Sequence, residues 1–307
     1  MPAMGELRVI IPAYNADAWL GETVASCLAV PEVARVIVVD DGSRRVQRGV
    51  LAGAIDAAGM ARVDCVRKDN GGGASARNTG AERFLEDGAA EWAVMLDHDD
   101  LLCPGISESL ALGARTGAAL VVSDRVEFRD DGWEMTRRHA ADIRAGDPVR
   151  PGRVHTPEHV WTATGLLVHR RVFEVGCRFD SRLAISDDID FIRQGCRVGP
   201  LVCSDAIGLA RREFVSGENL SGPKTLVRRV DDVVLLHERW YDDADAAGWR
   251  ETVRWLLNQL AKRGVSGEPV DRLRAIYRAH GWAVPMKLRW RLARNARRGG
   301  SAQIAST

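Results

Sequence analysis

The sequence of 307 residues predicts an α/β fold, in which a mostly parallel sheet is flanked by helices and followed by a helical C-terminal extension. In the first half, short apolar runs alternate with amphipathic stretches, and three of these runs end in clusters of polar residues. Strands that are apolar on both faces and are separated by helices are typical of a parallel sheet covered on both sides. Apolar residues at helical spacing from Thr225 onward predict the extension.

The expected elements follow one another regularly up to about residue 125. We expect buried strands at residues 8–12, 35–41, 62–67, 92–96 and 118–124. Helical spacing predicts helices over residues 16–30, 43–60 and 71–88, and Pro104 suits the first turn of another helix.

The pattern changes beyond this point. Residues 127–135 predict a β-hairpin with its turn at Asp131-Gly132. Residues 137–160 show little periodicity and predict a long loop, which in a compact domain is usually functional or mobile. Helical stretches then follow at residues 227–240, 249–264 and 270–281, where the tryptophans are expected to pack between helices.

Composition narrows the class of protein. Apolar residues make up 46% and charged residues 28% of the chain, and the formal net charge is +1, so no nucleic-acid partner is expected. We expect no secretory signal and no transmembrane segment, because no apolar run approaches ~20 residues. The six cysteines form no CxxC pair, which favours a reduced, cytoplasmic compartment over a zinc site or a disulfide framework.

The polar clusters after three expected strands point to a ligand site. They are Pro12-Ala13-Tyr14-Asn15, Asp40-Asp41-Gly42-Ser43 and Asp97-His98-Asp99-Asp100. Right-handed crossovers bring the carboxyl ends of parallel strands to one edge of the sheet, and ligands of open α/β sheets bind at that edge.

The third cluster suits a divalent cation. Asp97 and Asp99 are two residues apart, so in an extended segment they face the same side, whereas His98 faces the other. Mg²⁺ commonly takes one or two protein carboxylates and completes its shell with substrate phosphates and water. The alternative is a solvated acidic turn in which an aspartate caps a helix.

Three further segments have both a functional and a structural interpretation. Asp40 and Asp41 could accept hydrogen bonds from a base or a ribose, or could belong to a plain turn capped by Ser43. The glycine-rich residues 70–78 could bind an anion through free helix N-terminal amides and Arg77, or could be a loose loop. Asp187 and Asp188 could supply a general base, or could simply be first-turn acids favoured by the helix dipole.

Taken together in this order, the segments "VIIPAYN", "VIVVDDGS", "NGGGASARNTG", "VMLDHDDLLCP", "GLLVHRRVFEVGCRFD" and "SDDIDFIRQG" resemble glycosyltransferase family 2. The resemblance covers roughly residues 7–221. It implies a GT-A fold and an inverting hexosyltransferase that uses Mn²⁺ or Mg²⁺. Such an enzyme moves a sugar from a nucleoside-diphosphate sugar, here expected to be UDP-linked, to an acceptor hydroxyl by single displacement. It also implies a glycosyltransferase domain at 1–222, with a nucleotide-binding half at 1–125 and an acceptor-binding half at 126–222, and a helical extension at 223–307.

The resemblance also assigns roles to individual residues. The aspartates of the DxD pair, Asp97 and Asp99, would hold the metal, with Asp100 as an alternative ligand. Asp188 would be the catalytic base, with Asp187 able to share that role because it stands where relatives usually have Glu. The remaining implied positions are Pro12, Ala13, Tyr14, Asn15, Asp40, Asp41, Arg77, Asp97 and His98 for the nucleotide, and Thr164, Gly165 and Glu213 for the sugar and acceptor.

The chain departs from the family pattern at one other place. Many relatives have a His shortly before an Asn-x-Ser, whereas this chain has Arg212 and Glu213 before Asn219 and Ser221. Either Glu213 substitutes for the histidine, or the metal has fewer protein ligands.

Two other kinds of protein remain as alternatives. A sugar-phosphate nucleotidyltransferase would carry a glycine-rich basic loop after its first strand, where this chain has "PAYNADAW". A non-catalytic nucleotide-sugar-binding or scaffold protein would not need the acids at 97, 99 and 188.

The basic C-terminal segment has three interpretations. In Lys287 to Arg298, the apolar residues Leu288, Trp290 and Leu292 are two apart, which is not one face of a helix. We expect packing on the main domain or on a partner subunit, the latter giving a homo-oligomer through the C-terminal helices. Peripheral contact with an anionic membrane is the alternative.

Overall fold

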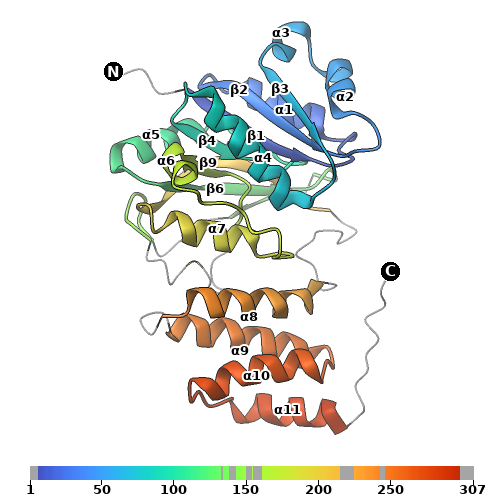
Figure 1. Ribbon diagram of the computed structural model, residues 1–307, viewed down its shortest axis with the longest axis vertical. Helices are drawn as coiled ribbons and strands as arrows, with labels where there is room; N and C mark the ends of the chain where they lie inside the picture. Colours follow the sequence, from blue (N-terminus) through green and yellow to red (C-terminus); the bar gives the residue numbers. More distant parts are fainter. Residues whose placement is uncertain are drawn as a thin grey trace. The chain divides into compact units, whose positions relative to one another are not determined.

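The computed structural model describes residues 6–132, 134–137, 143–149, 154, 161–214, 225–242 and 246–297. By its internal contacts the chain divides into two compact units. The first comprises Met1–Pro151, Trp161–Ser181 and Asp187–Ser216, and the second comprises Gly152–Val160, Arg182–Ser186 and Gly217–Thr307. Most of the elements are labelled in Figure 1. The predicted boundary at 222/223 stays a prediction, because residues 215–224 lie outside the described ranges.

The first unit is built on a nine-stranded sheet in the order β3-β2-β1-β4-β8-β6-β9-β5, with β7 paired to β6. Its strands are β1 (Leu7–Ala13), β2 (Val33–Asp41), β3 (Val63–Lys68), β4 (Trp92–Met95), β5 (Leu101–Leu102), β6 (Leu120–Phe128), β7 (Glu134–Arg137), β8 (Leu166–His169) and β9 (Leu201–Arg212). Its helices are α1 (Leu20–Leu28), α2 (Gln47–Ala54), α3 (Ala57–Met60), α4 (Gly72–Asp87), α5 (Ile106–Thr116), α6 (Arg170–Glu174) and α7 (Asp187–Gly195).

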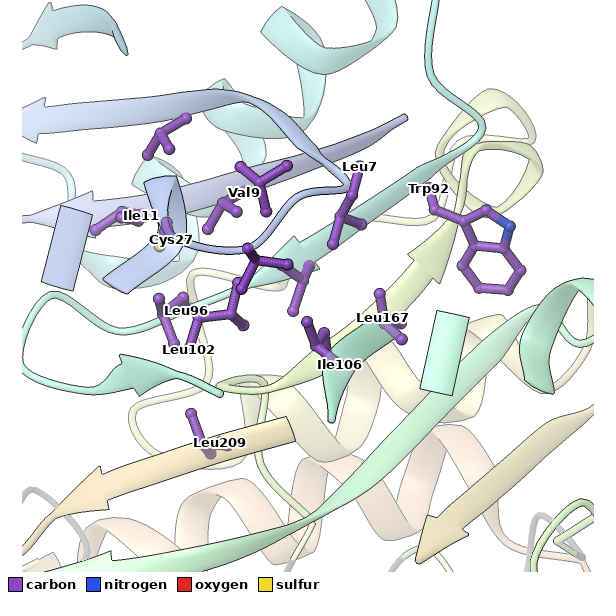
Figure 2. Close-up of a cluster of buried hydrophobic side chains, with 14 of the residues drawn as sticks. Leu7, Val9, Ile11, Cys27, Trp92, Leu96, Leu102, Ile106, Leu167 and Leu209 are labelled. Carbon is purple, nitrogen blue, oxygen red and sulfur yellow. The ribbon is translucent and has the colours of Figure 1, made fainter. Parts of the chain in front are cut away.

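The four N-terminal strands are parallel to one another, as predicted. β1 lies between β2 and β4, and β2 pairs with β3, all in parallel. Every residue of β1 and β4 is buried. Figure 2 shows the core on one side of these strands, where Leu7, Val9 and Ile11 of β1 meet side chains from α1, α5 and neighbouring strands. Helix α4 contacts β1 and β2, so apolar strands are covered by helices as the sequence indicated.

The remaining strands are mixed in direction. β8 is antiparallel to both β4 and β6, whereas β9 is parallel to β6. The predicted hairpin is confirmed: β6 and β7 pair in antiparallel fashion, and the Gly132 amide closes the turn on the Arg129 carbonyl at 3.0 Å. Residues 143–149 of the predicted long loop instead lie along β9, where the Val149 amide bonds the Leu201 carbonyl at 2.8 Å.

The helix predicted over residues 43–60 is the clearest departure in this unit. It is divided into α2 and α3, because Ile55 has an extended conformation at the end of α2. The Asp56 carboxylate then accepts a hydrogen bond from the Gly59 amide at 2.7 Å and caps α3. Aspartate is strongly favoured as a helix N-cap, so Asp56 begins a second helix inside a stretch whose apolar spacing looks continuous.

The second unit consists mainly of α8 (Arg228–Trp240), α9 (Ala246–Lys262), α10 (Glu268–Ala279) and α11 (Met286–Arg297). Its core is lined by aliphatic residues of all four helices. Trp240 and Trp249 are buried as expected, whereas Trp255 is 37% exposed, which corrects its assignment to helix packing. The buried Asp232 carboxylate of α8 accepts the amides of residues 184, 185 and 186 at 2.9–3.0 Å.

Two glycines in helices of the first unit give a matched test of packing. A Cβ on Gly80 of α4 would lie 2.3 Å from Cγ2 of Ile10 in β1, whereas a Cβ on the exposed Gly49 of α2 would meet nothing within 4 Å. We expect Gly80→Ala to destabilise the protein by roughly 1–3 kcal/mol through overpacking. Gly49→Ala should stabilise it by roughly 0.5–1 kcal/mol, because alanine loses less backbone entropy in a helix. Urea unfolding of both variants measures the difference, and equal effects would contradict the close packing of α4 on β1.

Candidate active site

The three polar clusters meet at one edge of the sheet, as predicted. β1 is central and parallel to its neighbours, and Ala13 at its end lies opposite Asp40 of β2. The segment leaving β4 stays beside β1, because the Leu96 amide bonds the Ile10 carbonyl at 3.0 Å. Asp97 follows directly.

The loop after β1 presents Tyr14 and Asn15 at the surface. Pro12 and Ala13 are buried within β1, whereas Tyr14 is 50% exposed. Asn15 has a φ of 50°. Its amide donates to the Ser43 hydroxyl at 2.9 Å, and its side-chain oxygen accepts the Arg44 amide at 3.0 Å. Asn15 therefore links the loops after β1 and β2 and leaves the Tyr14 ring accessible.

Asp41 is buried and caps the glycine-rich segment. Its carboxylate accepts the amides of Gly71 and Gly72, with shortest distances of 3.0 and 2.8 Å, and an ion pair from Lys68 at 2.8 Å. The interpretation of these amides as free anion donors is therefore wrong for Gly71 and Gly72. A glycine-rich helix start without its own capping side chain is satisfied by an acid from the neighbouring strand.

Asp40 is also buried and holds the turn after β2. It accepts the amides of Ser43 and Gln47 and an ion pair from Arg67 at 2.7 Å. Burial alone would raise the pKa of this carboxyl, but the hydrogen bonds from Ser43, Gln47 and Arg67 outweigh burial and lower it. Both carboxylates of the second cluster are thus occupied by protein donors.

Asp100 anchors the loop that follows β4. It is buried and accepts the Thr164 hydroxyl at 2.8 Å and the Arg212 amide at 2.9 Å. Burial, together with the charges of Asp97 and Asp99, raises the pKa of its carboxyl well above the usual range. Thr164 also accepts the Asp97 amide at 3.1 Å, so it connects both ends of the acidic cluster.

Arg212, which in the sequence stands out only as a departure from the family pattern, holds this loop in place. Its guanidinium donates to the Asp99 carbonyl at 3.1 Å, pairs with Asp130 and Glu22, and lies 4.7 Å from the Phe128 ring centroid. The signal available in the sequence was an arginine shortly after the apolar residues Leu209 and Ala210 of this strand. Its partners lie up to 190 residues away, so its role required the fold.

Asp97 and Asp99 remain the accessible acids of the third cluster. The Asp97 side chain is 36% exposed, and Asp99 is partly buried. Burial raises the pKa of Asp99; the charge of His98 opposes this rise, and that of Asp97 adds to it. His98 is bound to α1 through its backbone, because its carbonyl oxygen accepts a hydrogen bond from the Thr23 hydroxyl at 2.8 Å.

Arg77 joins the third cluster to the start of α7. Its guanidinium lies 2.8 Å from Oδ1 of Asp97 and 3.2 Å from Oδ2 of Asp187, and it covers the Phe179 ring at 5.5 Å. Burial alone would lower the pKa of Arg77, but the charges of Asp97, Asp187 and Asp188 raise it instead. One cation therefore offsets carboxylates from two segments.

Asp188 lies in the first turn of α7. One of its oxygens accepts the amide of Ile189 at 2.7 Å. Burial, followed by the charge of Asp187, raises the pKa of Asp188 to about 8. Burial also raises the pKa of Asp187, against the charge of Arg77. A carboxyl with a pKa near neutral pH is suited to accept a proton from a substrate.

The residues expected near a sugar or acceptor lie on different elements. Gly165 has a φ of 80°, and its amide bonds the Met95 carbonyl at 2.8 Å, so a side chain there would be strained. Glu213 forms an ion pair with Arg211 at 3.2 Å. Asn219 and Ser221 lie outside the described residues.

The accessible acids of the third cluster suit a divalent cation whose coordination shell is completed by the substrate. Among the described residues, no group of three or more His, Cys, Asp or Glu could hold a metal ion by itself. Asp97 and Asp99 provide two hard oxygen donors, which is the protein share that Mg²⁺ commonly takes beside substrate phosphates.

Comparison with known proteins gives a consistent result. The sequence model of the family described as "Glycosyl transferase family 2" matches residues 8–176, just over half of the chain. The succinoglycan biosynthesis protein ExoU of Rhizobium meliloti (strain 1021) is 27% identical over 264 residues, which is 79% of this chain and 73% of ExoU. An undecaprenyl-phosphate 4-deoxy-4-formamido-L-arabinose transferase of Pseudomonas aeruginosa is 32% identical over 131 residues, 41% of this chain and 38% of that protein.

Solved structures of similar fold confirm the predicted GT-A architecture. TarS 1-349 of S. aureus in complex with UDP-GlcNAc has a TM-score of 0.56 at 12% identity, over 91% of this chain and 93% of TarS 1-349. The mannosyltransferase PcManGT from Pyrobaculum calidifontis, in complex with GDP-Man and Mn²⁺, has a TM-score of 0.58 at 15% identity, over 97% of this chain and 81% of that chain.

The bridge made by Arg77 can be tested by its removal. Arg77→Met should lower the free energy of unfolding by about 2–3 kcal/mol at neutral pH, because two partly buried carboxylates, Asp97 and Asp187, lose their compensating charge. The cost stays below that of a fully buried pair, since the Asp97 side chain is 36% exposed. The loss should shrink at acid pH, where protonation removes the repulsion. Denaturant unfolding at several pH values measures it.

Arg83 of the same helix gives a matched control. It also pairs with two carboxylates, Asp64 and Glu86, but its side chain is 44% exposed. Arg83→Met should leave stability nearly unchanged, because exposed ion pairs contribute little. A similar, pH-independent loss in both variants would contradict the electrostatic role of Arg77.

Proposed function

Since the chain belongs to glycosyltransferase family 2 and therefore transfers a sugar from a nucleotide-sugar donor, we propose that it works by an inverting single displacement with Asp188 as the base. The observation that carries the proposal is the bridge from Asp97 through Arg77 to Asp187, beside Asp188. The bridge joins Asp97, which with Asp99 could hold a cation on the donor diphosphate, to Asp187. Asp187 is followed directly by Asp188, the carboxyl that would take the proton of the acceptor.

The donor is proposed to be a UDP-linked hexose. The exposed ring of Tyr14, beside Pro12 and Ala13, offers a stacking surface for the base. TarS has been solved with UDP-GlcNAc and PcManGT with GDP-Man, so the preference for uracil or guanine is to be measured by nucleotide binding. Asp40 and Asp41, whose oxygens already accept amides of Gln47 and Gly72, support the neighbouring turn after β2 and the start of α4.

Asp97 and Asp99 are the residues that would hold a divalent cation. Mn²⁺ or Mg²⁺ bound there would supply positive charge to the diphosphate of the donor. The bonds that Asp100 makes to Thr164 and Arg212 favour Asp99 over Asp100 as the second ligand. The ion pair of Glu213 with Arg211 supports a place for Glu213 at the acceptor side instead of at the metal.

The proposed displacement has three parts. The Asp188 carboxylate takes the proton from an acceptor hydroxyl as that oxygen attacks the anomeric carbon. The bond from this carbon to the diphosphate oxygen breaks, and the nucleoside diphosphate leaves with the bonding electrons. Arg77 provides a fixed cation for the negative charge that develops, and Asp187 holds Arg77 in position. Thr164 and Gly165 border the place for the transferred sugar.

The location proposed for this reaction is the cytoplasm. All six cysteines are free thiols, as a reducing compartment favours. None of the described helices is both long and apolar enough to span a membrane.

The assignment of the base gives the principal test. We expect Asp188→Asn to lower kcat by roughly 10²–10⁴-fold while donor binding is retained, because the amide cannot accept the proton. In the unmutated enzyme, kcat/KM should rise with pH along a limb with an apparent pKa of about 8, since only the ionised carboxyl is a base. Initial rates with a radiolabelled donor, together with donor titrations, measure both effects.

Asp187→Asn is the comparison variant for this test. It removes a partner of Arg77 but leaves Asp188 in place. The kcat/KM of this variant should therefore still rise with pH, with a shifted apparent pKa. If Asp187→Asn abolished transfer and Asp188→Asn did not, Asp187 would be the base. A kcat/KM that does not change with pH would reject both carboxyls as the catalytic base.

The metal ligands are tested by nucleotide binding. Asp99→Asn should weaken the Mn²⁺-dependent binding of UDP by at least the ~10-fold that loss of an outer-shell metal partner costs. Binding without metal should change little. Titration calorimetry of UDP, with GDP in parallel, measures both the metal dependence and the base preference.

Asp205→Asn, at an exposed aspartate of β9, is the control for the change of charge. Unchanged metal-dependent affinity in Asp99→Asn would reject this ligand, and tighter binding of GDP than of UDP would reject the proposed donor.

A further inference from the structure

Helix α11 of the second unit carries an unusual combination of charges. It contains Lys287, Arg289, Arg291, Arg294 and Arg297 within twelve residues and has no acidic side chain. One side of it is buried at Leu288, Leu292 and Asn295, and the Asn295 side chain donates to the Ala261 carbonyl of α9 at 3.0 Å. These positions fix which side of α11 packs on α9.

The other side of α11 exposes two large apolar residues. Met286 is 84% and Trp290 is 65% exposed, and they lie four residues apart, on the same side of the helix. The guanidinium of Arg294 lies 5.3 Å from the Trp290 ring centroid. The sequence spacing of Leu288, Trp290 and Leu292 concealed this arrangement. The two leucines face inward, and the tryptophan joins Met286 in facing outward.

A hollow of about 440 Å³ lies between α9 and α11. Two of its lining residues, Lys287 and Arg291, directly follow Met286 and Trp290 in the sequence. Its lining includes Arg254, Lys262, Lys287 and Arg291, and Trp255, which is 37% exposed. Glu251, the acid in this lining, is ion-paired with Arg254. The hollow is therefore basic, has an aromatic wall, and has the size and charge to receive an anionic group such as a phosphate.

We propose that this surface, formed by Met286, Trp290 and the basic side chains around the hollow, docks on an anionic lipid bilayer. Met286 and Trp290 would enter the headgroup region, and the hollow would take a lipid phosphate. Tryptophan is favoured at the membrane interface, and helices that lie on membranes combine an apolar side with Lys and Arg. Lys and Arg are attracted to anionic lipids.

The charge of the surface argues against a second copy of the chain as its occupant. A symmetric contact through α11 would bring two helices together that each carry five basic residues and no acid. Such a contact places like charges opposite one another, whereas an anionic bilayer complements all of them. The proposal concerns binding alone and does not depend on the assignment of the base or the metal.

Vesicle co-sedimentation of the full chain tests the proposal. The protein should bind vesicles that contain phosphatidylglycerol and phosphatidylcholine in equal amounts, and should not bind vesicles of phosphatidylcholine alone. Binding should fall as salt is raised, because exposed charges are screened. The double variant Lys287→Glu/Arg291→Glu should weaken binding more than about 20-fold, since each basic residue lost near such a surface costs roughly five-fold.

Two further variants separate the contributions. Met286→Ser/Trp290→Ser should also weaken binding, while its thermal unfolding stays unchanged because both side chains are exposed. Arg274→Glu/Arg278→Glu on α10 makes the same change in net charge outside the surface and should bind normally.

Three results would overturn the proposal. One is equal binding to neutral and anionic vesicles, or none to either at low salt. Another is vesicle binding that survives in both α11 variants. A third is a dimer, seen by light scattering, that Met286→Ser/Trp290→Ser converts to a monomer, which would assign the surface to a second copy. Free inorganic phosphate that competes with the vesicles would support the hollow as the phosphate site.

Discussion

The ion-pair bridge of Arg77 to Asp97 and Asp187 is the interaction on which the geometry of the site depends. The three residues come from α4, from the loop after β4 and from the start of α7, which the chain separates by as many as 110 residues. Without a cation between them, the carboxylates of Asp97, Asp187 and Asp188 would repel one another in a poorly solvated place. A single guanidinium therefore holds the loop after β4 and the start of α7 together.

The acids around this bridge divide into two groups by their partners. Asp40, Asp41 and Asp100 are buried, and their oxygens accept hydrogen bonds from amides, hydroxyls or cations of the protein. Asp97 and Asp99 are partly accessible and keep capacity for a ligand. The first group builds the loops that hold the second. Loss of a buried acid would therefore distort the site indirectly, by leaving its backbone donors unsatisfied.

Part of this could be predicted from the sequence. Apolar runs bounded by helical patterns gave the parallel strands correctly, because burial on both faces leaves a local signature. The direction of β8 had no such signature, because it depends on pairing with β4 and β6. Nor could the sequence distinguish the structural Asp41 from the accessible Asp97. Both follow buried strands, and only the amide partners supplied by Gly71 and Gly72 tell them apart.

The raised pKa of Asp188 links the chemistry of the site to the stability of the fold. The folded chain holds the Asp188 proton up to a pH of about 8, whereas an unfolded aspartate releases it near pH ~4. The stability that protonated Asp188 contributes is complete below the lower value and is lost as the pH rises through the higher one. Burial of this carboxyl thus places its pKa in the range useful to a general base, and the folded state is less stable at a pH where this carboxyl is ionised. Arg77 limits this cost, because its charge acts in the opposite direction to burial.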